Sequence, residues 1–153
     1  MRRLYFLLTC CLLLSPAVHA AEGHILKVLP QFLDKKGRAS LTPSLYDRDA
    51  YQAILRKTPE KRSALRYAIQ WKADTKETEA LTLRIELIGA AQDEKPKQTS
   101  LEITVHQRHW FSHWTNLTLT EEQYKSFGDV TAWRVTLWDG DKLLGEQKSF
   151  LWQ

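Results

Sequence analysis

Strict alternation of apolar and polar residues recurs along this sequence, and it limits the fold more than any other feature. The clearest case is residues 63–73, where one side of an extended chain collects Leu65, Tyr67, Ile69 and Trp71. A period of two places one face of a strand in a core and the other in solvent, which is typical of antiparallel sheets. Residues 80–88, 100–105 and 132–138 repeat the pattern. We therefore predict one continuous core made by Leu65, Tyr67, Ile69, Trp71, Leu81, Leu83, Ile85, Leu87, Leu101, Ile103, Val135 and Leu137.

Three further segments complete a set of seven predicted strands. Residues 24–33 form a first strand that Pro30 marks as an edge or a bulge, and residues 114–119 form another. Asp139-Gly140 separates residues 132–138 from residues 142–152 and is a strong hairpin signal, because glycine adopts positive φ cheaply. The returning strand is expected to pair antiparallel and to bring Phe150-Leu151-Trp152 against the core.

One helix interrupts the strands. Apolar residues recur at helical spacing between Leu45 and Lys57, Ser44 with Asp47 makes a weak capping box, and Pro59 ends the segment. The basic residues that follow, Arg56, Lys57, Lys61 and Arg62, either complement the helix C-terminus or contact an anionic surface. A shorter helical turn is expected from Thr120, which has capping-box spacing to Gln123.

The order of elements predicts the fold class. Seven short alternating strands in one domain indicate a mostly β, antiparallel sandwich of the immunoglobulin-like or fibronectin-like kind, with one short helix inserted between strands 1 and 2. The cysteine pair that marks immunoglobulin domains is absent, because Cys10 and Cys11 are adjacent near the N-terminus.

The first twenty residues resemble a secretory signal peptide. Arg2 and Arg3 precede an apolar run over residues 4–14, and Val18-His19-Ala20 offers a cleavage site. We expect residues 1–20 to be removed, residues 21–153 to form a single domain, and the protein to be exported to the periplasm or beyond. Cleavage also removes both cysteines, so the mature chain carries no thiol.

Charge and hydropathy exclude two classes of partner. Loss of Arg2 and Arg3 halves the formal net charge of +4, and no basic stripe or recognition motif points to nucleic acid. The apolar run over residues 4–14 is too short to span a bilayer, so no transmembrane segment is expected after cleavage.

Residues 44–62, together with residues 132–140 and 149–152, resemble segments of uncharacterised exported bacterial proteins with an immunoglobulin-like β-sandwich. The resemblance implies export and the sandwich fold. It implies no activity and no catalytic residue.

Three histidines form one cluster with potential chemistry. His106, His109 and His113 are spaced for one helical face and could bind zinc or copper, although the segment is expected to be a strand end and a turn that separates them. No other cofactor is indicated.

Aromatic residues beside the histidines give a second candidate site. Trp110, Phe111 and Trp114 could stack on sugar rings if they are exposed, or they could fill space at the rim of the core.

No nucleophile elbow, phosphate-binding glycine loop or zinc-protease motif occurs, which argues against an enzyme. The sequence thus predicts an exported, non-enzymatic module that binds a protein or associates with the cell envelope. A glycan-binding module and a metal-binding domain are the alternatives.

Overall fold

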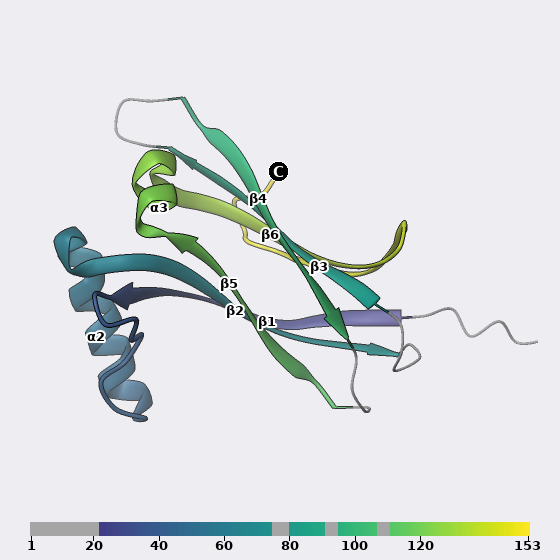
Figure 1. Cartoon of the computed structure of the whole chain (residues 1–153), viewed down its shortest axis with the longest axis horizontal. Helices are drawn as coiled ribbons and strands as arrows, with labels where there is room; N and C mark the ends of the chain where they lie inside the picture. Colours follow the sequence, from purple (N-terminus) through teal and green to yellow (C-terminus); the bar gives the residue numbers. More distant parts are fainter. Residues whose placement is uncertain (1–21, 75–79, 91–94, 107–110) are drawn as a thin grey trace, which may run out of the picture.

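Two antiparallel sheets face each other in the structure, a computed structural model that describes residues 22–74, 80–90, 95–106 and 111–153. One sheet has the strand order β1-β2-β5 and the other has the order β4-β3-β6-β7 (Figure 1). The predicted signal segment and its two cysteines lie outside the described residues. The strands are β1 (Glu22–Asp34), β2 (Arg62–Asp74), β3 (Ala80–Ala90), β4 (Lys97–His106), β5 (His113–Thr120), β6 (Asp129–Asp139) and β7 (Lys142–Lys148).

The strand order confirms the predicted two-sheet sandwich and refines it. When the strands are lettered A to G in chain order, the sheets are ABE and DCFG. Constant-type immunoglobulin domains keep the fourth strand in the first sheet, as ABED and CFG. Here β4 pairs with β3 instead of β5, so the fourth strand belongs to the second sheet.

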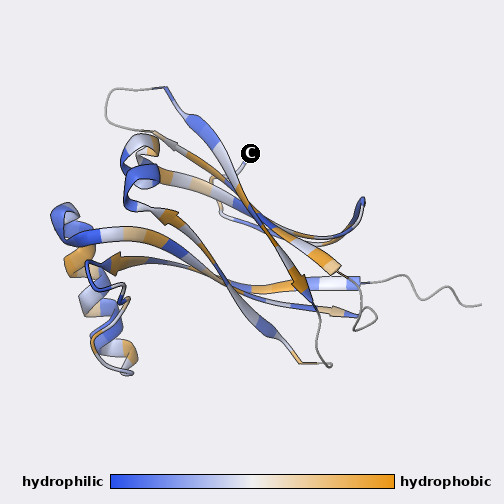
Figure 2. Cartoon of the chain, viewed as in Figure 1, coloured by the Kyte–Doolittle hydropathy of each residue, from blue (hydrophilic) through white to orange (hydrophobic). Residues whose placement is uncertain are grey.

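The core follows the predicted register. Side chains that the alternation assigned to the inner face are buried on β2, β3 and β6, and hydrophobic and hydrophilic residues alternate along the strands (Figure 2). The prediction is wrong at Ile103, which is 40% exposed, and only partly right at Leu101, which is half-buried. Both lie on β4, an edge strand that has a sheet neighbour on one side only.

The inserted helix α2 (Leu45–Lys57) lies between β1 and β2 in sequence, as predicted, and the 3-10 turn η1 (Pro59–Lys61) follows it. The Ser44 hydroxyl caps its first turn by accepting from the Asp47 backbone amide. The Gln52 side chain then bonds both backbone groups of Phe32, at 2.8 and 2.9 Å. The helix therefore attaches to the outer edge of β1 as a neighbouring strand would.

The structure has a second helix, where a shorter helical turn was predicted, in addition to the one helix of the predicted fold class. α3 (Glu121–Phe127) begins at the helical turn that the spacing of Thr120 and Gln123 indicated, and both hydrogen bonds of the capping box are present. Helices α2 and α3 lie at the same end of the molecule (Figure 1). Among the described residues, no helix is both long enough and apolar enough to cross a bilayer.

The C-terminal hairpin is confirmed, but its last strand is shorter than predicted. Asp139 pairs with Lys142, so Gly140 and Asp141 are the central turn residues, and Gly140 has a φ of 54°. β7 ends at Lys148 instead of residue 152. The expectation that the C-terminal residues pack against the core is wrong for Phe150, which is 99% exposed, and for Leu151, which is 62% exposed. Trp152 is half-buried, and the Arg134 guanidinium lies 5.2 Å from the centre of its ring.

Candidate functional site

The histidine candidates belong to different sheets. His106 ends β4 and is exposed, whereas His113 begins β5 on the opposite sheet and is half-buried. His109 lies outside the described residues. In the described ranges, no group of three or more His, Cys, Asp or Glu residues is arranged to hold a metal ion. Metal binding by His106, His109 and His113 stays a prediction, which a competition titration against a zinc chromophore would test.

His113 has a structural environment of its own. Its ring lies 5.3 Å from the buried ring of Trp71, tilted by 38°, and these two residues pair across β2 and β5. The indole of Trp71 donates to the Thr115 hydroxyl at 2.9 Å. His113 therefore covers the rim of the core.

The aromatic candidates lie at the start of β5. Phe111 is 59% exposed and Trp114 is 51% exposed, whereas Trp110 lies outside the described residues. Trp114 pairs with Gln70, so its side chain projects from the outer face of the sheet. Two of the three predicted aromatic residues thus offer apolar surface to a ligand or partner.

β5 is also an edge strand, with β2 as its neighbour in the described part of the chain. Its sequence, HWTNLTLT, holds no Lys, Arg, Asp, Glu or Pro, and its pairing with β2 has no register shift. The other edges carry such residues: β1 has Pro30, β4 has Glu102 and β7 has Glu146. Proteins protect sheet edges from further pairing with charge, proline or bulges. β5 lacks all three devices.

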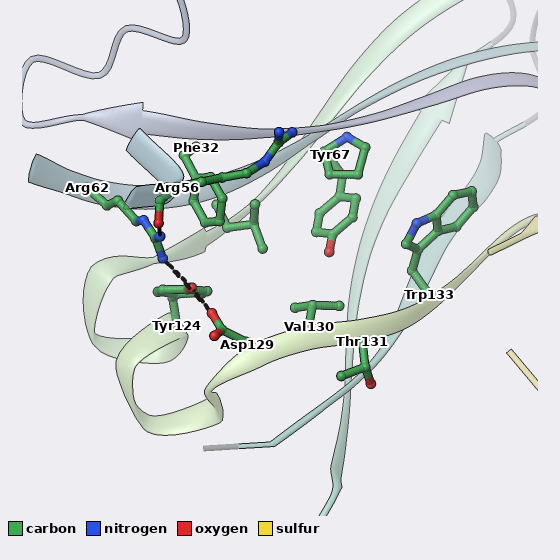
Figure 3. Close-up of a pocket in the computed structure, with 11 residues that line it drawn as sticks. Phe32, Arg56, Arg62, Tyr67, Tyr124, Asp129, Val130, Thr131 and Trp133 are labelled. Carbon is green, nitrogen blue, oxygen red and sulfur yellow. Dashed lines mark hydrogen bonds and ion pairs between the residues drawn. The ribbon is translucent and has the colours of Figure 1, made fainter. Parts of the chain in front are cut away.

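A cavity of about 430 Å³ lies between the sheets at the end that carries α2 and α3 (Figure 3). We call it the inter-sheet cavity. Its walls come from both sheets and both helices, and its volume falls within the range of small-molecule sites. The residues that line it are Pro30, Phe32, Arg56, Arg62, Leu65, Tyr67, Tyr124, Asp129, Val130, Thr131 and Trp133.

Arg62 closes one end of this cavity and holds α2 in place. Its guanidinium donates to the carbonyls of Leu55, at 2.5 Å, and Arg56 in the last turn of α2. It also donates to the Tyr124 hydroxyl at 2.7 Å and lies 4.1 Å from the centre of the Phe32 ring. The predicted cationic complement of the helix C-terminus is thus provided by a buried arginine from the next strand.

Asp129, the acidic residue at the same end of the cavity, also has partners. The Tyr124 hydroxyl donates to Asp129, and the carboxylate of Asp129 lies 4.0 Å from the Arg62 guanidinium (Figure 3). Burial, followed by the hydrogen bond to Asp129, raises the pKa of Tyr124 to about 12. Arg62, Tyr124 and Asp129 are therefore linked through the Tyr124 hydroxyl, and the cation and the carboxylate lie at its two sides.

Tyr67 differs from the other polar groups of the cavity. The residue is 1% exposed, its hydroxyl points into the inter-sheet cavity (Figure 3), and it has no hydrogen-bond partner among the described residues. Burial is the main cause that raises the pKa of Tyr67, so the hydroxyl stays protonated at neutral pH and is available as a donor.

The sequence predicted Tyr67 as a core residue but did not reveal its hydroxyl as a candidate binding group. Alternation assigns a residue to a face and says nothing about where two sheets separate. The one signal in the sequence was a tyrosine on a face that is otherwise apolar, since a buried hydroxyl usually needs a partner.

Comparisons with known proteins do not assign the chain to a family. No protein-family model and no curated protein matches the chain. Among solved structures, the chain is similar to an immunoglobulin-like protein from Pseudomonas aeruginosa, with 11% identity, a TM-score of 0.38, and coverage of 86% of this chain and 97% of that one. The assignment of a seven-strand antiparallel sandwich rests on the pairing of the strands themselves.

Proposed function

We propose that the protein is an exported, non-enzymatic binding module that takes up an extended segment of another protein along β5. The observation that carries the proposal is the unprotected edge of this strand. Unpaired backbone groups in a row are satisfied best by another strand, and such strand addition is a common mode of peptide recognition. Trp114, exposed on the same strand, supplies an aromatic anchor of the kind that dominates binding energy at interfaces.

Export to the envelope rests on the signal-like first twenty residues. The partner would then be another exported or envelope protein. Strand addition needs no catalytic group, in keeping with the lack of catalytic motifs in the sequence.

The test places a photo-crosslinking amino acid at Asn116, in the middle of β5, and identifies the captured protein in the native envelope. The purified partner is then titrated against the wild-type chain and against Thr118→Lys, which adds a charge to the exposed side of β5. Thr104→Lys makes the same change on the exposed side of β4 and serves as the matched control.

We expect Thr118→Lys to weaken binding about tenfold or more and Thr104→Lys to leave it unchanged, because a lysine obstructs only the edge on which it lies. Amide hydrogen exchange in β5 should slow when the partner is bound. Equal binding by both variants would overturn the proposal. Crosslinks to a second copy of this chain alone would show that the edge mediates self-association.

A glycan-binding module is the second candidate, and the exposure of Phe111 and Trp114 favours it. Stacking on a sugar ring uses the face of Trp114 and leaves the backbone edge unused. Tryptophan fluorescence titrated with cell-wall oligosaccharides should then respond in the wild type and in Thr118→Lys, but not in Trp114→Ala. A response that Trp114→Ala retains would eliminate this candidate.

A further inference from the structure

The inter-sheet cavity lies at the helical end of the sandwich, and its lining residues include none from β5. Apolar side chains from both sheets, Pro30, Leu65, Val130 and Trp133, line one part of its wall, and polar side chains line the rest. A cavity of about 430 Å³ with this lining suits the apolar body of a small organic molecule.

The unpartnered hydroxyl of Tyr67 indicates what else the occupant must carry. Buried polar groups are almost always hydrogen-bonded, and a buried donor without an acceptor costs stability. The Tyr67 residue is 1% exposed, and its hydroxyl points into the cavity (Figure 3). An occupant with an acceptor oxygen would satisfy it.

Arg56 defines the charge of the occupant. It lines the inter-sheet cavity and also a second cavity of about 380 Å³, and Pro30 lines both as well. Its side chain is exposed and forms no ion pair with any residue that the structure describes. The other charged groups nearby are engaged: Arg62 with Asp129 at 4.0 Å, and Arg48 with Asp49 at 3.3 Å. Arg56 is therefore a lining cation without an ion-pair partner in the described part of the chain, and a guanidinium binds a carboxylate with two parallel hydrogen bonds.

We propose that the inter-sheet cavity binds a small organic carboxylate, with its apolar body between the sheets, its carboxylate on Arg56 and a second oxygen accepting from the Tyr67 hydroxyl. This site is independent of the protein interface proposed on β5, so either proposal can fail without the other.

The experiment uses three related probes and calorimetric titration of the purified chain. The first is 4-oxo-4-phenylbutanoate, which carries a phenyl ring, a ketone oxygen and a carboxylate. The second is its primary amide, which lacks the charge, and the third is 4-phenylbutanoate, which lacks the ketone. We expect the first probe to bind about tenfold more tightly than either of the others, since each lost group removes one hydrogen-bonded contact.

Two variants assign those contacts. Tyr67→Phe should lower the affinity for the keto acid to that for 4-phenylbutanoate, while leaving the melting temperature unchanged or raised, because it removes a donor that has no partner in the free protein. Arg56→Gln should abolish the preference for the acid over the amide. Lys57→Gln is the matched control, because it removes the same charge from the same helix end and does not line the cavity.

Several results would overturn the proposal. These are failure of all three probes to bind at millimolar concentration, equal binding of the acid and the amide, or unchanged keto-acid affinity in Tyr67→Phe. A crystal grown with the keto acid that shows only ordered water on the Tyr67 hydroxyl would do the same.

Discussion

Arg62 ties the C-terminal end of the inserted helix to the sandwich. Its three side-chain hydrogen bonds join the end of α2 to α3, and the residue is 9% exposed. Removing this buried guanidinium is costly, because the carbonyls of Leu55 and Arg56 and the Tyr124 hydroxyl lose their hydrogen-bond donor together.

We expect Arg62→Met to lower the free energy of unfolding by about 2 to 4 kcal/mol, measured by urea denaturation. Arg84→Met removes the exposed pair with Glu102 and should cost no more than about 1 kcal/mol. Equal losses in the two variants would contradict the role of Arg62.

Asp34, at the end of β1, is expected to make a contribution to stability that is lost in acid. Burial alone would raise the pKa of Asp34, but hydrogen bonds from the Arg38 backbone and side chain, the Tyr51 hydroxyl and the Lys36 amide outweigh it and hold the pKa well below its ordinary value. A carboxyl whose pKa is depressed by folding stabilises the protein fully above its unfolded pKa of about 3.9. That contribution is lost as the pH falls below this value through the folded pKa.

Asp34→Asn should therefore destabilise the protein by about 2 kcal/mol at neutral pH and reduce the loss of stability below about pH 4. Thermal unfolding followed from pH 7 to pH 2 provides the measurement. Asp49→Asn, on the exposed surface of α2, is the control and should unfold at neutral pH like the wild type. If Asp34→Asn loses stability in acid as much as the wild type does, the acid sensitivity of the protein comes from other groups.

At the scale of elements, the sequence predicted which segments form strands and which face of each strand is buried more accurately than it predicted where a strand ends. Alternation in β2 and β3 predicts the buried face because one register alone places Ile69 and Leu83 inside. The end of β7 depends on a contact that no pattern encodes. Ser149 bonds both backbone groups of Trp133, at 2.9 and 3.0 Å, and the chain turns away there. The apolar run that follows therefore leaves the sheet.

Two truncations separate these contributions. Ending the chain after Ser149 should shift the melting temperature by less than about 2 °C, because Phe150 and Leu151 are exposed and Trp152, although half-buried, is stacked beside the Arg134 guanidinium and is not part of the core cluster. Ending it after Lys148 also removes the bonds of Ser149 to Trp133 and should lower the melting temperature by about 3 to 5 °C. A large shift from the first truncation would mean that the aromatic end packs on the sandwich after all.

At the scale of the whole molecule, the candidate sites differ in how far the sequence could predict them. The features that leave the edge of β5 unprotected could be predicted from a short stretch of sequence, since residues 113–120 include Trp114 and no Lys, Arg, Asp or Glu. The inter-sheet cavity could not, because Tyr67, Val130 and Tyr124 meet only after three distant segments pack together. Sequence patterns with short periods assign faces, whereas a cavity depends on the separation of two sheets.

The closure of the sandwich at the end opposite the helices depends on two glycines that face each other across the sheets. A Cβ on Gly145 would overlap the carbonyl oxygen of Gly23 and would lie 3.2 Å from the amide nitrogen of His24. Both contacts are with backbone, which cannot rotate away as a side chain would. β1 and β7 belong to different sheets, so this close approach holds the two layers together along one side.

Gly145→Ala should therefore force β1 and β7 apart and lower the free energy of unfolding by about 2 to 3 kcal/mol, as overpacking of a closely fitted contact does.

Gly37→Ala is the control. Gly37 has a φ of 72°, and a Cβ at this position would meet no atom within 4 Å, so its substitution costs only backbone strain of about 1 kcal/mol. Gly37→Asn should recover part of that loss, because asparagine adopts positive φ more readily than alanine, whereas Gly145→Asn should be worse than Gly145→Ala. Urea denaturation of the four variants distinguishes steric from conformational costs. If Gly145→Ala unfolds at the wild-type denaturant concentration, β1 and β7 do not touch in solution and the sandwich is open along this side.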